Sequence, residues 1–292
     1  MTTAASHSSI GDTAGRRDVA RQLVVLISSV LAIVAAFIGS GVIVGTPIQD
    51  AAGGTLDADS TLIAPGTGAF RIWSVIYVGM LAYAVWQALP AQRHDERQRR
   101  LGWWVTASLV LNAVWIASVQ LDLLALSLPI IVALLVVLCR LFVILRGTAP
   151  KNRVEAVVAD GSIGLYLGWV VIATAANATA VLVAAGFEGF GLDPEIWAVL
   201  VLAVAAAAGV ALAFWGGGRV APALALSWGL CWVAVARLTD EPRSVTTGVA
   251  ALIAAAVVAA ATAIARVRQE RARQRSTGDE SSAVSDERAV SG

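Results

Sequence analysis

The stretch APGTGAFRIWSVIYVGMLAYAVW, residues 64–86, is an apolar run introduced by a proline. Phe70, Trp73 and Tyr77 follow one another in it at intervals of three and four residues. At about 3.6 residues per helical turn, this spacing places the three rings on one face of a helix. The stretch therefore predicts an aromatic wall that is directed into a bundle of helices.

The composition indicates a membrane protein. Of the 292 residues, 58% are hydrophobic and 14% are charged, whereas a soluble domain carries about 25% charged residues. A helix needs about 20 apolar residues to cross a hydrocarbon core of about 30 Å, and the chain supplies runs of that length one after another. We therefore expect an all-α, multi-pass protein of the plasma or inner membrane, in contact with membrane lipid.

Polar and charged segments divide the apolar runs into eight predicted spans. They cover residues 23–46, 70–89, 103–119, 123–145, 161–185, 196–215, 220–236 and 244–265. Residues 1–22 predict a disordered leader, and residues 266–292 predict a tail that is first basic and then disordered. With eight spans, the arginine-rich segments gather on the side of both termini, so the positive-inside rule predicts that both termini are cytoplasmic.

Two further spans carry aromatic and amide side chains at helical spacing. These are Asn112 and Trp115 in LNAVW (111–115), and Tyr166, Trp169, Ala173 and Asn177 in YLGWVVIATAAN (166–177). An amide without a partner in hydrocarbon costs several kcal/mol. Asn112 and Asn177 are therefore predicted to point into the bundle, toward another helix or a ligand.

Each of these residues also has a purely structural interpretation. Asparagine side chains hold membrane helices together with about 0.6–2 kcal/mol per hydrogen bond, and tryptophan anchors helices at membrane interfaces. The anchor role is the expectation at the ends of the spans, for Trp103, Trp104, Trp197 and Trp215. Within the seventh span, Trp228 and Trp232 lie one turn apart, a spacing that allows them to extend a pocket, but packing is the expectation for both. Trp73, Trp115 and Trp169 lie within spans beside tyrosine or asparagine, which favours a ligand site.

The three motifs resemble those of one family. The pattern Pro-x4-Phe-x2-Trp-x3-Tyr at Pro65, Phe70, Trp73 and Tyr77 resembles the second-helix signature of the TspO/translocator-protein family, the tryptophan-rich sensory proteins. LNAVW is similar to the third-helix motif of that family, and residues 166–177 resemble its fifth-helix motif. The resemblance covers about residues 23–187 and implies a TspO-like five-helix bundle, followed by a three-helix extension over residues 188–265.

The resemblance also implies a function. It implies a receptor or carrier with an internal pocket for a flat hydrophobic ligand, either a porphyrin or haem-type tetrapyrrole or a sterol-like lipid, and a homodimer. The pocket would be lined by Pro65, Phe70, Trp73, Tyr77, Asn112, Trp115, Tyr166, Trp169, Ala173 and Asn177. The first external loop retains only Pro65 of the family's Trp-x-Pro-Pro element, which leaves the identity of the ligand open.

Two other functions stay open. The first alternative is an enzyme that degrades porphyrin in light, and the second is an ion-coupled transporter of small molecules. No His, Asp or Glu lies deep within a predicted span, and Asp122 and Asp160 at span ends are expected to be solvated loop carboxylates. No metal, required cofactor or nucleic acid is predicted, so the sequence favours ligand binding over catalysis.

Overall fold

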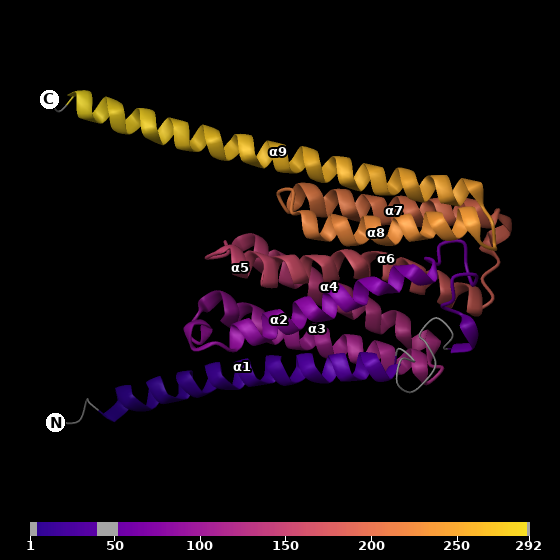
Figure 1. Cartoon of the computed structure of the whole chain (residues 1–292), viewed down its shortest axis with the longest axis horizontal. Helices are drawn as coiled ribbons and strands as arrows, with labels where there is room; N and C mark the ends of the chain where they lie inside the picture. The colour runs from indigo at the N-terminus through magenta and orange to yellow at the C-terminus, as the bar shows by residue number, and fades with distance from the viewer. Residues whose placement is uncertain (1–4, 40–51, 291–292) are drawn as a thin grey trace.

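A computed structural model describes residues 5–39 and 52–290 of the chain. Eight helices in these ranges are long and apolar enough to cross a membrane, which confirms the prediction of an all-α protein with eight spans. The helices run antiparallel, and both termini lie at one end of the bundle (Figure 1). We call this end the terminal end and the opposite end the distal end.

The long helices follow the predicted order. They are α1 (Ala5–Gly39), α2 (Ile72–Ala88), α3 (Glu96–Gln120), α4 (Leu124–Gly147), α6 (Ser162–Ala184), α7 (Pro194–Trp215), α8 (Val220–Thr239) and α9 (Val245–Val290). The short elements are η1 (Ala52–Gly54), η2 (Thr67–Arg71), η3 (Pro90–Gln92), α5 (Arg153–Glu155), η4 (Ala156–Gly161) and η5 (Gly189–Gly191). Residues 40–46 of the predicted first span lie outside the described ranges.

The ends of the chain differ from the prediction of disorder. Helix α1 already begins at Ala5, and Arg21 is buried because its guanidinium donates to the carbonyls of Gln92 and Arg93 at 3.2 and 3.0 Å. At the other end, α9 continues to Val290. Its first polar turns are rich in Arg, Gln, Glu and Ala, which are good helix formers. The predicted leader and tail are thus helical over their described residues.

The fifth span is longer than predicted. Elements α5, η4 and α6 form one continuous stretch of 32 residues, Arg153–Ala184, whereas the prediction placed residues up to 160 in a loop. Likewise α3 begins at Glu96 rather than at residue 103, because the Asp95 carboxylate caps it by accepting the N–H of Gln98 at 3.0 Å. Both helices therefore carry charged residues at the terminal end.

The last three helices share one core with the first five. Helix α6 packs against α4 on one side and α8 on the other, and α8 packs against α9. Buried side chains of α7, α8 and α9, such as Leu202, Leu226 and Val258, belong to the same cluster as those of α2, α3 and α4. Close approach of α6 and α8 is possible because Gly164 and Gly168 face Ala221 and Pro222.

Candidate functional site

The rings of the predicted aromatic wall meet between η2, α2 and α6. Trp73 stacks on Tyr77 with ring centroids 5.2 Å apart and 17° between the planes. It meets Tyr166 and Trp169 edge to face at 5.8 and 6.1 Å, and Trp169 meets Phe70 at 5.9 Å. We call these five residues the aromatic cluster. Such edge-to-face contacts are a favourable arrangement of aromatic rings.

Hydrogen bonds from α3 and α4 fix the polar edge of the cluster. The Asn112 amide donates to the Tyr77 hydroxyl at 2.9 Å, and the Trp115 indole donates to Asn177 Oδ1 at 2.7 Å. Asn177 Nδ2 in turn donates to Ser127 Oγ on α4 at 2.8 Å. Both asparagines are buried, which confirms that they point into the bundle. Ser127 was not anticipated, because a lone serine in an apolar run carries no distinguishing signal.

Two buried polar atoms at the cluster have no hydrogen-bond partner in the described part of the chain. They are the indole nitrogen Nε1 of Trp169 and the amide oxygen Oδ1 of Asn112. An unsatisfied buried group of this kind costs about 1–3 kcal/mol. The cluster therefore retains one donor and one acceptor without a partner, and of these two residues Trp169 lines the adjoining cavity.

A small cavity adjoins the cluster. Six of the ten predicted site residues line it: Pro65, Phe70, Trp115, Trp169, Ala173 and Asn177. The other four, Trp73, Tyr77, Asn112 and Tyr166, lie behind these in the cluster and its hydrogen bonds. The cavity volume is about 40 Å³, far below the roughly 300–1,000 Å³ of small-molecule pockets. The structure therefore shows a closed site.

Apart from Ala176 and Ala180 of α6, the remaining wall of the cavity is the cap loop, residues 55–65, which precedes η2. Helix α8 holds this loop and its continuation. The buried Arg237 guanidinium donates to the carbonyls of Thr61, at 3.2 Å, and of Ala58. Trp228 Nε1 donates to the carbonyl of Ala69 at 2.9 Å, and the Trp232 carbonyl accepts the N–H of Gly66 at 3.1 Å.

These contacts extend the sequence-based expectations. Trp232 packs against the core, as expected, whereas Trp228 is 39% exposed. Both also bind the backbone that follows the cap loop. The seventh predicted span ends at residue 236 and so leaves Arg237 in the following loop, whereas Arg237 is buried in the last turn of α8. No local signal links Arg237 to the cap loop, because two of its acceptors are backbone carbonyls about 180 residues earlier in the chain; the third is the nearby Pro242 carbonyl.

Replacing Arg237 with glutamine is expected to loosen the cap loop. Hydrogen bonds from a charged donor contribute about 1.5–3 kcal/mol, so we expect a destabilisation of about that size. Thermal unfolding of the purified protein measures it, and faster proteolysis near residues 58–61 shows where it acts. The exposed Arg243 at the same end provides the control as Arg243→Gln. Equal stability of the two variants would contradict the role given to Arg237.

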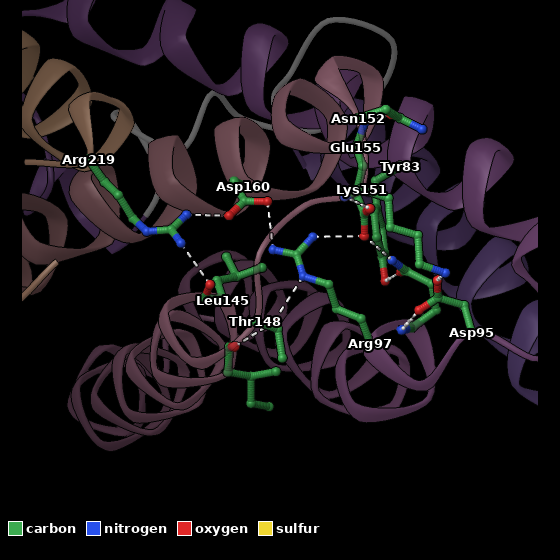
Figure 2. A network of polar contacts seen from close by, with 12 residues as sticks. Tyr83, Asp95, Arg97, Leu145, Thr148, Lys151, Asn152, Glu155, Asp160 and Arg219 are labelled. Atoms are coloured by element: carbon green, nitrogen blue, oxygen red, sulfur yellow. Dashed lines mark hydrogen bonds and ion pairs between the residues drawn. The ribbon is translucent and has the colours of Figure 1, made fainter. Parts of the chain in front are cut away.

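A polar cluster lies at the terminal end, where α3 and the fifth span begin and α4 ends. Figure 2 shows its contacts. Arg97 on α3 donates to Glu155 Oε1 at 2.8 Å and to Asp160 Oδ2 at 2.7 Å. Arg219, which precedes α8, pairs with the other oxygen of Asp160 and donates to the Leu145 carbonyl at 2.7 Å. We call these four charged residues the ion network. It ties α3, α4, α8 and the start of the fifth span together.

The environment of Asp160 corrects a prediction. Its side chain is 10% exposed and bound by two arginines, so it is not a solvated loop carboxylate. Glu155 and Asp160 are five residues apart, which would place them on different faces of an α-helix. The intervening η4 is a π-helix, whose wider turn follows an i to i+5 repeat and brings both carboxylates to Arg97. Figure 2 shows Arg97 between them.

The ion network has a structural role rather than a catalytic one. Glu155 also accepts from Gln98 at 2.9 Å and from the backbone N–H of Lys151 at 2.7 Å, so neither carboxylate is free to act as a base. At the edge of the network, Lys151 pairs with Asp95. Burial disfavours ionisation of Asp95, but Lys151 and the Gln98 N–H outweigh it and hold the pKa below its ordinary value. The described residues contain no cluster of metal-binding side chains.

Together, the fold and the aromatic cluster define a helical membrane protein with a closed aromatic site between its helices. The family model described as TSPO-like protein matches residues 24–264. The chain therefore belongs to the TSPO-like protein family and is a multi-pass membrane protein of the TspO type. The match continues through α7 and α8 into α9, whereas the motifs that resemble the family end before about residue 187. No curated protein and no solved structure matches the chain.

Proposed function

We propose that the protein binds a flat hydrophobic ligand at the aromatic cluster, of the tetrapyrrole or sterol-like class, as a sensory receptor or carrier of the plasma or inner membrane. One observation carries the proposal: rings from η2, α2 and α6 converge beside a cavity lined by Trp169, whose indole N–H lacks a partner in the described chain. Aromatic faces suit planar ligands, and a few polar groups orient them.

Binding requires the site to open. A volume of about 40 Å³ does not admit a tetrapyrrole, and α6, which carries Tyr166 and Trp169 of the cluster, is packed against both α4 and α8. The cap loop is the wall that can move, because hydrogen bonds rather than a continuous helix hold it in place. The ligand would displace this loop from the cavity and satisfy the Trp169 indole.

Ion-coupled transport is less well supported. It requires an ionisable group near the middle of the membrane, whereas the ion network lies at the terminal end and all four of its charges are paired (Figure 2). The homodimer implied by the resemblance is likewise a proposal, which the mass of the purified protein in detergent tests.

A titration with protoporphyrin IX in the dark tests the proposed function. Quenching of tryptophan fluorescence should saturate for the wild type. Ala173→Leu fills the cavity and should weaken binding at least tenfold. Trp169→Phe removes the five-membered ring of the indole together with its N–H. One aromatic contact contributes about 0.5–1.5 kcal/mol, so we expect the affinity for the porphyrin to fall roughly two- to tenfold.

The matched control is Trp215→Phe, which changes a tryptophan that contacts Phe142 and Arg146 far from the cluster. Its affinity should equal that of the wild type. Free tryptophan corrects for absorption by the porphyrin. Equal affinity of all four proteins would contradict the assignment of the site. Illumination of the complex then separates binding from degradation, because an enzyme would consume the porphyrin absorbance and a receptor would not.

A further inference from the structure

A larger pocket lies at the distal end, on the outer side of the cap loop. Its volume is about 580 Å³, within the roughly 300–1,000 Å³ of small-molecule sites. The cap loop, the ends of α6 and α7, and the connections after α6 and α8 form its walls. We call it the distal pocket. Ser60 and Thr61 line both this pocket and the inner cavity, so the cap loop separates the two.

The floor of the distal pocket is apolar and partly aromatic. It includes Leu62, Ile63, Leu182, Phe187 and Trp197. Trp197 Nε1 already donates to the carbonyl of Gly189 at 2.9 Å, so its N–H is occupied and the ring contributes apolar surface to the lining. Phe187 meets Trp197 edge to face with ring centroids 5.5 Å apart. Such a floor accepts a hydrocarbon or aromatic body, and aromatic faces also attract cations.

The polar lining of the pocket is mainly acidic. Glu188, Asp193 and Glu195 line it, against a single cation, Arg243. Thr61 lines both this pocket and the inner cavity, and its hydroxyl Oγ1 is buried without a hydrogen-bond partner within the described ranges. The pocket therefore combines an apolar and partly aromatic floor with a net negative charge.

The surface around the distal pocket also carries a net negative charge. The charged residues described at the distal end are Asp57, Asp59, Asp122, Glu188, Asp193, Glu195, Asp240 and Glu241 against Arg71, Arg237 and Arg243. The guanidinium of Arg237 is moreover buried among backbone carbonyls. An excess of one charge around a low-dielectric pocket attracts ligands of the opposite charge and repels those of the same charge.

We propose that the distal pocket binds an amphipathic organic cation. The apolar body of the ligand lies on the Trp197 floor, and its positive charge lies near Glu188, Asp193 and Glu195. This site and this ligand class differ from the proposed aromatic site, because a porphyrin bearing carboxylates is repelled by the acidic lining. The proposal therefore does not depend on whether the protein binds a porphyrin.

Two probes of nearly identical shape and opposite charge test it. The full chain in phosphatidylcholine nanodiscs is equilibrated with tetraphenylphosphonium or with tetraphenylborate, and empty nanodiscs correct for partitioning into lipid. The cation should bind saturably and the anion should not. The triple variant Glu188→Gln/Asp193→Asn/Glu195→Gln should bind the cation at least tenfold more weakly. These substitutions keep acceptors for the Glu195 N–H and the Ser244 hydroxyl.

The control is Asp122→Asn, which removes one negative charge from the same end outside the pocket. Asp122 has a φ of 57°, a conformation that asparagine also adopts readily. The affinity of the Asp122→Asn variant for the cation should therefore equal that of the wild type. Val183→Trp obstructs the pocket without changing its charge and should also weaken binding at least tenfold. Wild-type affinity in the triple variant and in Val183→Trp, or equal binding of both probes, would overturn the proposal.

Discussion

Replacing Arg97 with methionine is expected to destabilise the protein by about 3–5 kcal/mol, because the change leaves buried carboxylates without their cation. The Arg97 side chain is 5% exposed and that of its partner Glu155 is fully buried. Asp160 keeps Arg219, but Glu155 keeps only neutral donors. Unfolding of the purified protein by SDS in mixed micelles measures the loss.

A second variant separates lost charge balance from lost packing. Arg97→Met combined with Glu155→Gln removes both charges of the pair, and replacing a buried pair by neutral groups is often nearly neutral for stability. We therefore expect the double variant to regain most of the loss. Arg266→Gln is the surface control, since its pair with Glu270 is exposed and such pairs contribute about 0.3–0.5 kcal/mol. A loss for Arg97→Met no larger than that of the control would contradict the buried network.

The second large effect is expected at Gly168, where α6 meets α8. A Cβ at this position would lie 2.0 Å from the carbonyl oxygen of Pro222 and 2.8 Å from its carbonyl carbon. Because both atoms belong to the backbone, neither can rotate away, and Gly168→Ala must push the two helices apart. Overpacking of this kind costs about 1–3 kcal/mol, and Gly168→Val should cost more.

The matched control is Gly147→Ala at the end of α4. A Cβ at Gly147 would meet nothing within 4 Å, so this variant should be as stable as the wild type or slightly more stable, since alanine restricts the unfolded chain. Unfolding midpoints in the same detergent compare the two. If Gly168→Ala were as stable as Gly147→Ala, α8 would not pack on α6 as described, and α7 to α9 would be a separately docked unit.

Much of the architecture follows from the sequence because each feature is local. A span needs only an apolar run of sufficient length, and the convergence of Trp73, Tyr77, Tyr166 and Trp169 needs only helical spacing. Buried amides must find partners, so the inward direction of Asn112 and Asn177 was also predictable.

The features that the sequence did not reveal depend on partners far along the chain. Glu155 and Asp160 resemble loop charges until a π-helix turns both toward Arg97, about 60 residues earlier. Arg237 resembles a loop cation until its acceptors in the cap loop are known. The closed state of the cavity depends on how side chains pack, which the spacing of aromatic residues along a helix does not determine.

Protection of a cysteine at position 173 would locate the ligand. The native cysteines, Cys139 and Cys231, are both exposed. For the experiment, both are first replaced by serine, so that Ala173→Cys supplies the single thiol of the protein. Its reaction with methyl methanethiosulfonate is followed in the dark with and without saturating protoporphyrin IX. A bound ligand should slow the reaction at least tenfold, whereas labelling of the native Cys139, in a protein that lacks Cys231, should be unchanged. An unchanged rate at position 173 would show that the ligand does not occupy the aromatic site.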